Sequence, residues 1–230
     1  NNANTNAANT IDNYGVIQSR TTGTFDAIGS SASTTNDLVF INRAGASVVG
    51  NLNMGNGNDR LTLETGSTIT GSFNGGAGTN SLTLAGDTTG SLAGNLNNFQ
   101  SLVKDGAGQW TLSGALGNNG GATPLAVSVN QGTLALTSNN TSFNGSMGVN
   151  AGGILEGGAQ NLPSSVTNNG LVRFAQAADG TYAGVVSGGG ALEKTAAGAF
   201  TLTGAQVYTG GTTVSAGTLQ VGNGGISGSL

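Results

Sequence analysis

The side chains that most often carry out acid–base, nucleophilic or metal chemistry are scarce in this chain. Its 230 residues include 6 Lys and Arg, 10 Asp and Glu, and neither His nor Cys. A Ser-His-Asp triad or a thiol nucleophile therefore cannot form within this segment, and metal ligation is left to carboxylates. Two loose acidic groups remain: Asp26 with Asp37, and Asp59 with Arg60 and Glu64. Isolated charges are usually solvated surface, so we predict no catalytic residues and no enzyme activity here.

Two glycine-rich stretches are similar in sequence to a calcium-binding loop. MGNGNDRLT and GGAGTNSLT are similar to the nonapeptide that binds calcium in parallel β-rolls, where Asp59 would be a ligand. A β-roll needs such nonapeptides in tandem. Here they begin twenty-one residues apart, at Met54 and Gly75, and the neutral Asn80 replaces the aspartate of the second one. We therefore predict no metal site.

A third stretch, from Gly188 to Thr195, is superficially similar to a phosphate-binding loop. In such a loop a Gly precedes the Lys and a helix follows. Here Glu193 precedes Lys194, and the residues that follow alternate between apolar and polar, as expected for a β-strand. We predict no nucleotide site and no other cofactor.

Composition favours strands and turns over helices. The chain has 43 Gly, 2 Pro, 36% hydrophobic residues and only 7% charged residues. Short apolar runs such as SLTLAG, TLALTS and TLQVG alternate apolar and small polar residues, as half-buried strands do, and glycines separate them. A flexible linker would lack such runs.

Charge and hydropathy limit the partners. A net charge of −4 with no basic stripe makes nucleic acid an unfavourable partner. No run of about 18 apolar residues is present to span a bilayer, and the first ten residues, NNANTNAANT, do not form a signal peptide. We expect an internal fragment of a longer protein.

Internal repeats are the strongest feature of the chain. SLVKDGAGQWTLSG, followed by VSVNQGTLALTS, returns as ALEKTAAGAFTLTG, followed by TTVSAGTLQVG, so that residues 101–136 and 188–222 form two copies of one repeat. IDNYGVI near the start also returns as VTNNGLV. With a spacing near twenty residues, strands this short bury their apolar face only by stacking on equivalent strands about 4.8 Å away.

These patterns predict one continuous, elongated all-β domain over residues 1–230, a parallel β-helix of roughly eleven coils and about 50 Å. A β-sandwich and a β-propeller are the competing folds, although both usually carry more aromatic residues and a steadier period. Within the repeat, we expect Trp110, Phe200 and Leu202 to lie inside the stack and Gly198 to mark a corner. Lys104 and Lys194 are expected to extend outward into solvent.

The segment from Gly188 to Gly222 resembles, nearly position for position, the passenger-associated transport repeat of Gram-negative autotransporters. The copy around Lys104 is similar but degenerate, because Ala115 to Leu125 replaces a compact connection and is expected to form a loop. The resemblance implies a right-handed β-helix displayed on the cell surface. It also implies secretion through the outer membrane by a C-terminal β-barrel that is absent from these residues.

Two functional classes remain, because the resemblance does not reveal what the passenger binds or cuts. The first is an adhesin, a virulence-type rod whose polar flank binds host surface molecules or copies of itself on neighbouring cells. The alternative is a stalk that assists folding and secretion and carries a separate upstream protease or esterase. A globular, His-containing domain before Asn1 would favour the stalk. A carbohydrate-active β-helix enzyme is a third class, but it needs an acidic groove that this sequence does not indicate.

Overall fold

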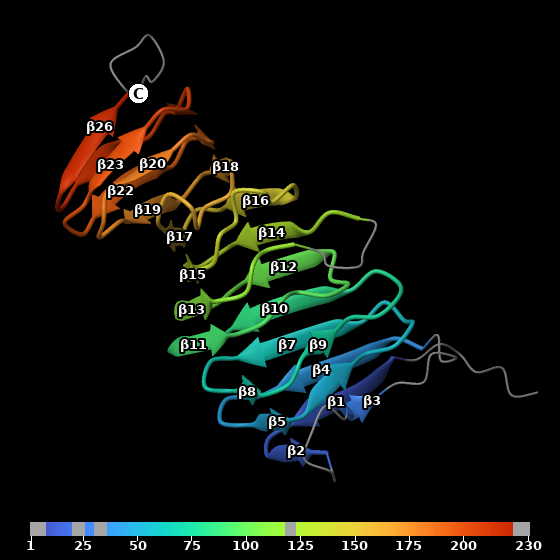
Figure 1. The fold of residues 1–230 in the computed structure, drawn as a ribbon. Coiled ribbons are helices and arrows are strands. Elements are labelled where there is room, and N and C mark those ends of the chain that lie inside the picture. The colour runs from blue at the N-terminus through green and yellow to red at the C-terminus, as the bar shows by residue number, and fades with distance from the viewer. Residues whose placement is uncertain (1–7, 20–25, 30–35, 118–122, 223–230) are drawn as a thin grey trace, which may run out of the picture.

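Parallel β-strands make up all of the regular structure in the described part of the chain. A computed structural model describes residues 8–19, 26–29, 36–117 and 123–222, and no helix occurs among them. Every strand pairing in these ranges is parallel, and each joins strands of successive coils. Figure 1 shows the resulting stack, with β1 to β3 at one end and β26 at the other. The predicted all-β parallel β-helix is confirmed, whereas a sandwich or propeller would pair antiparallel neighbours.

Five sheets surround the core in the described ranges of the chain. The longest, here called the ten-stranded sheet, consists of β1 (Asn9–Asn13), β4 (Leu38–Asn42), β7 (Arg60–Glu64), β10 (Ser81–Ala85), β12 (Ser101–Lys104), β14 (Ala126–Val129), β16 (Ser146–Val149), β18 (Ser165–Asn168), β21 (Val185–Gly188) and β24 (Val207–Tyr208). The seven-stranded sheet consists of β11 (Thr89–Leu92), β13 (Gln109–Leu112), β15 (Gly132–Leu136), β17 (Gly153–Gly157), β19 (Leu171–Ala175), β22 (Ala191–Thr195) and β25 (Thr212–Val214).

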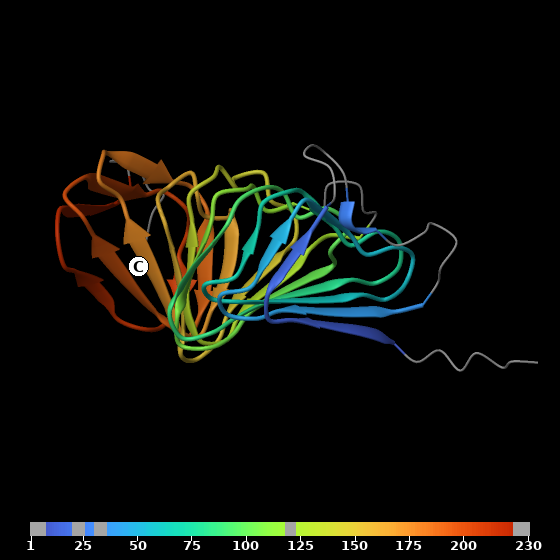
Figure 2. The same cartoon turned by 90° about the horizontal axis from the view of Figure 1, so that it is seen from below.

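The other three sheets have three strands each. Two lie in the N-terminal coils: β2 (Val16–Gln18), β5 (Ser47–Val49) and β8 (Thr68–Ile69), and β3 (Asp26–Gly29), β6 (Asn51–Asn53) and β9 (Phe73–Asn74). The third lies in the C-terminal coils: β20 (Gly180–Tyr182), β23 (Ala199–Leu202) and β26 (Thr218–Val221). Figure 2 shows the same stack turned, with the blue N-terminal coils and the orange C-terminal coils at opposite ends.

The coil length is close to twenty residues but not uniform. Ser81 pairs with Ser101, twenty residues later, whereas Ser101 pairs with Ala126 and Asn9 pairs with Leu38. These two longer connections include residues outside the described ranges, among them 118–122 of the loop expected at Ala115 to Leu125. Because long connections use up residues, the longest sheet has ten strands rather than the roughly eleven coils estimated from the sequence.

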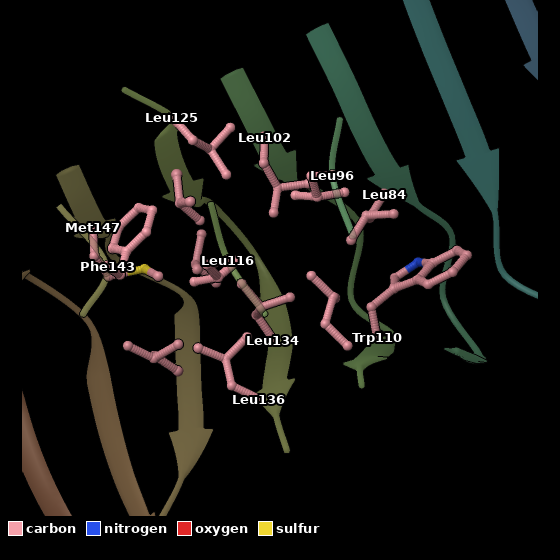
Figure 3. Packing of buried hydrophobic residues seen from close by; sticks show 14 of the residues in the cluster. Leu84, Leu96, Leu102, Trp110, Leu116, Leu125, Leu134, Leu136, Phe143 and Met147 are labelled. Carbon is pink, nitrogen blue, oxygen red and sulfur yellow. The ribbon is translucent and has the colours of Figure 1, made fainter. Parts of the chain in front are cut away.

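The core is a column of aliphatic and aromatic side chains from successive coils. Strand β4 is buried at alternate positions, as a period of two requires. Aligned inward positions of the ten-stranded sheet hold Phe40, Leu61, Leu82, Leu102, Val127, Met147, Val166 and Val186, all almost fully buried. Figure 3 shows Leu84, Leu102 and Met147 on one side of this interior and Trp110 and Leu134 on the other. Each coil therefore covers the apolar face of the next.

The repeated phrase that contains Asn-x-Gly forms the same corner twice. Asn13 and Asn168 end strands of the ten-stranded sheet and are almost fully buried. The side-chain oxygen of Asn13 accepts the backbone N–H of Gly15 at 3.1 Å, and that of Asn168 accepts the N–H of Gly170 at 3.0 Å. The asparagine thus turns the chain toward the next sheet by satisfying a backbone donor locally.

Candidate functional site

The two repeat copies form the same two-strand unit on different faces of the stack. In the first copy, β12 belongs to the ten-stranded sheet and β13 to the seven-stranded sheet. In the second copy, β22 belongs to the seven-stranded sheet and β23 to a three-stranded sheet. Relative to the first copy, the second copy is therefore shifted by one sheet around the solenoid axis. Such a unit can occupy any two adjacent faces, because each strand needs only a parallel strand above and below it.

Lys104 lies in the interior, so the prediction that it extends into solvent was wrong. Its side chain is 0% exposed and sits in register between Leu84 and Val129. The Nζ atom donates hydrogen bonds to the backbone oxygens of Asp105 at 3.2 Å, Gly106 at 2.8 Å and Gln131 at 3.0 Å. The lysine thus provides donors for carbonyl groups at the corner of its own coil and at the corner of the next.

Lys194 repeats this arrangement, and the outward prediction was wrong for it as well. It is 1% exposed, and Nζ donates to the oxygens of Thr195 at 2.5 Å, Ala196 at 2.8 Å and Ala216 at 3.4 Å. It also donates to Gln176 O at 3.3 Å. Ala216 stands just before a Gly-Thr-Leu phrase, as Gln131 does in the first copy. We call each lysine with its carbonyl acceptors a lysine clamp.

The chemistry of the clamp follows from the donor count of an ammonium group. Lysine carries three N–H donors and no acceptor, which matches the three carbonyl positions that the two clamps share. Lys194 has Gln176 O as a fourth acceptor within reach. Burial lowers the pKa of Lys194 and of Lys104, and in Lys104 nearby Asp105 and Asp87 act in the opposite direction. The inward position was readable in the sequence: both lysines stand two residues after a buried Leu, on the same side of the strand.

The aromatic position of the repeat is inside the stack, as predicted. Trp110 and Phe200 are both 0% exposed. The Trp110 Nε1–H donates to Ala85 O at 2.9 Å, and a Cβ at Gly90 would lie 2.8 Å from the indole, so this glycine makes room for the ring. Phe200 stacks on Phe174 with ring centroids 4.3 Å apart. These rings fill the coil interior and present no stacking surface to a ligand.

The other two structural predictions for the repeat are also confirmed. Leu202 is 0% exposed. Gly198 lies in the corner between β22 and β23, where a Cβ would approach Ala178 O to 2.4 Å. The corner residue with a left-handed backbone, however, is Ala196, whose φ is 64°, and the first copy has Gly106 with φ 83° at that place.

Replacing Ala196 by Gly is expected to stabilise the protein by about 1 kcal/mol, because an L-residue in the left-handed region costs about 1–2 kcal/mol and glycine returns part of this as chain entropy. Chemical denaturation of the two proteins measures the difference. Ala199→Gly, in strand β23, is the matched control and should lower stability instead. A loss of stability in Ala196→Gly would contradict the strain interpretation.

The structure does not assemble the acidic groups singled out in the sequence. Asp26 accepts a hydrogen bond from the Asn53 amide at 2.7 Å, whereas Asp37 accepts the backbone N–H of Asn58 at 2.8 Å. Asp59 faces the interior, whereas its neighbour Arg60 is exposed on the opposite side of the chain. Alternation along a strand separates adjacent residues in this way, so sequence proximity did not bring them together.

Two acid–arginine–acid ladders cross three coils each, and the sequence analysis missed both. Arg43 lies 2.7 Å from Asp12 and 2.8 Å from Glu64. The second ladder lies on the seven-stranded sheet, where Arg173 is 3.1 Å from Glu156 and 2.8 Å from Glu193. The arginines hold the pKa of Asp12 and of Glu193 below the usual range. Partly exposed pairs of this kind are weakened by solvent, so they support the stacking order modestly.

The stretch that resembled a phosphate loop is a strand–turn–strand. Gly188 ends β21, and Lys194 is in β22 with its amine turned inward. Among the described residues, no three His, Cys, Asp or Glu side chains come together as metal ligands, and no helix is long and apolar enough to cross a membrane.

The outer face of the ten-stranded sheet is free of charged side chains from β10 to β21. Its two outward rows consist of Ser81, Ser101, Ala126, Ser146, Ser165 and Val185, and of Thr83, Val103, Ser128, Gly148, Thr167 and Ser187. We call these twelve positions the hydroxyl strip. A shallow groove of about 350 Å³ lies over its central strands, β12, β14 and β16. Small side chains on neighbouring strands leave this hollow.

The coil geometry defines a parallel β-solenoid, and the comparison with family models agrees. Residues 102–123 and 192–221 match the passenger-associated-transport-repeat model, and each match contains one clamp lysine. The comparisons with curated proteins and with solved structures found no match. The chain therefore carries two transport repeats on a solenoid that matches an autotransporter passenger β-helix. Such repeats and folds are typically structural and non-catalytic, and the family implies a secreted, cell-surface protein of Gram-negative bacteria.

Proposed function

We propose that this segment is an adhesive rod of an autotransporter passenger, and that it joins neighbouring cells by binding to copies of itself through the hydroxyl strip. The strip is the observation that supports this function. It runs over six stacked strands without a charged side chain, although the chain as a whole has a net charge of −4. Two copies can therefore approach along this face without the repulsion that other surfaces would produce.

The chemistry of the strip is complementary to itself. Ser and Thr hydroxyl groups both donate and accept hydrogen bonds, so a row on one copy can pair with the same row on another. Small side chains let two sheet faces approach to about 10 Å, the spacing at which sheets interdigitate. A two-fold axis through the strip would place the same residues on both sides of the interface.

A lysine placed in the strip is expected to abolish aggregation of cells that display the full passenger. Ser128→Lys brings like charges together across a two-fold contact, which costs several kcal/mol when the charges are buried. The matched control is Thr111→Lys, an outward position on β13 of the seven-stranded sheet, and it should leave aggregation intact. Mixing Ser128→Lys cells with Ser128→Glu cells should restore aggregation between the two populations.

Unchanged aggregation in Ser128→Lys, with normal display on the surface, would overturn the proposal. If Ser128→Lys instead abolishes attachment to host cells while self-aggregation stays normal, the strip recognises a host molecule. If neither property changes, the segment is a stalk, the function that an upstream protease or esterase domain would require. Secretion through the protein's own C-terminal β-barrel belongs to this proposal and is common to all three outcomes.

A further inference from the structure

A ladder of side-chain oxygens joins four coils just before the strands of the ten-stranded sheet. The backbone N–H of Leu38 donates to Asp59 Oδ1 at 2.7 Å, and the N–H of Asp59 donates to Asn80 Oδ1 at 2.8 Å. The N–H of Asn80 in turn donates to Gln100 Oε1 at 2.6 Å. In each step, a side-chain oxygen thus accepts a hydrogen bond from a backbone N–H group of the preceding coil.

Asp59 differs from the two amides above it in the ladder. The Asn80 amide nitrogen donates to Asn98 O at 2.9 Å, so both ends of that side chain are satisfied. Asp59 is 0% exposed, and its Oδ2 atom is buried without a hydrogen-bond partner in the described part of the chain. An ionised carboxylate here would be a buried charge with one unsatisfied oxygen, an arrangement that proteins rarely tolerate.

We propose that Asp59 is a proton-dependent lock between adjacent coils. In the closed stack its carboxyl group is protonated and therefore uncharged, while Oδ1 accepts the backbone N–H of Leu38. When the proton leaves, the negative charge stays buried and the junction between β4 and β7 loosens.

The groups around Asp59 favour the neutral form. Asp37, on the coil of Leu38, is a second negative charge, and Arg60 is exposed on the outer face of β7. The coils above present the neutral Asn80 and Gln100. Burial, and to a smaller extent Asp37, raises the pKa of Asp59, while the hydrogen bond from Leu38 opposes this.

The direction of the pH dependence follows from that shift. A carboxyl group whose pKa is higher in the folded state than its unfolded value near 3.8 stabilises the fold most below that value. The stabilisation is lost as the pH rises through the folded pKa. Asp12 and Glu193, whose pKa values are lowered, have the opposite dependence and lose stability in acid. The contribution of Asp59 must therefore be measured as a difference between variants.

Asp59→Asn is the test, because asparagine keeps the Oδ1 acceptor and is uncharged at all pH values. We expect the variant to be more stable than the wild type at pH 7, and the difference to shrink toward pH 4. Each pKa unit of the shift corresponds to a tenfold change in the unfolding equilibrium. Asp179→Asn is the matched control: this exposed carboxylate also accepts a cross-coil N–H, from Ala199 at 2.8 Å, and its replacement should not reproduce the gain in stability at pH 7.

Hydrogen exchange at the Leu38 amide gives a local readout. In the wild type its protection should fall as the pH rises, beyond the intrinsic increase of exchange with pH, and in Asp59→Asn only the intrinsic increase should remain. A stability difference that does not depend on pH, or a less stable Asp59→Asn, would overturn the proposal. Calcium chloride is the remaining probe: if it stabilises the wild type but not Asp59→Asn, and a chelator reverses this, Asp59 is a metal ligand and not a proton lock.

Discussion

Replacing Lys194 by Met is expected to lower the free energy of unfolding by about 3 kcal/mol, because it removes a buried charged donor and leaves backbone carbonyls without partners. Methionine keeps most of the side-chain volume, so the loss reports the hydrogen bonds of the clamp more than packing. Lys194→Gln should also lose stability, since the glutamine side chain is shorter than that of lysine and its amide has only two N–H donors. Denaturant titration with a strand signal in circular dichroism measures both effects.

If Lys194 extended into solvent, as the sequence suggested, its replacement would change stability little, so the experiment distinguishes the two positions of the side chain. Arg60→Gln removes one positive charge from an exposed side chain and is the matched control, with an expected change within about 0.5 kcal/mol. Lys104→Met should resemble Lys194→Met, because Lys104 has three equivalent carbonyl acceptors in the first repeat copy. Wild-type stability in both lysine variants would show that the clamps do not hold the corners.

Truncating Phe200 to Ala is expected to cost about 3–5 kcal/mol, the range for a fully buried aromatic residue in a well-packed core. The ring is stacked on Phe174 and lies 6.4 Å from the ring of Tyr182, so its removal opens a cavity between coils. In a solenoid each coil is a template for its neighbours, and the damage should extend beyond one coil. Denaturant titration measures the loss, and limited proteolysis of the passenger displayed on cells should show reduced resistance.

Val207→Ala is the control for Phe200→Ala, because Val207 is 60% exposed and loses little packing on truncation. Phe200→Leu should recover part of the stability by refilling most of the cavity. Wild-type protease resistance in Phe200→Ala would contradict the interpretation that this ring holds adjacent coils together.

Much of the fold was predictable because it depends on local alternation. Runs such as Leu82-Thr83-Leu84 dictate which side of a strand is buried, and glycine and asparagine place the corners. The repeated position of Trp110 and Phe200 indicated an interior site, since an aromatic ring that recurs between alternating residues must pack somewhere in the stack. Parallel stacking then followed from the short strand length, because no single coil can bury its own apolar face.

The lysine clamps show where the same reasoning stopped. The alternation placed Lys104 and Lys194 on the buried side, but the general rule that lysines are exposed favoured the other interpretation. What the rule omits is the supply of carbonyl acceptors at the corner, which depends on how the turns of successive coils meet around one amine. Only the folded coils bring the oxygens of Asp105 and Gln131 within reach of the same Nζ.

By itself, the amino-acid sequence determined the strands, the turns and the stacked all-β architecture, because these depend on residue types a few positions apart. The tertiary structure decided the register between coils, and with it every contact between residues about twenty positions apart. That register placed Arg173 between Glu156 and Glu193 and shifted the second repeat copy to the neighbouring pair of sheets. It also left Asp59 buried next to the side chain of Asn80. Coil lengths vary with each connection, and a difference of one residue turns a side chain from the interior to the surface.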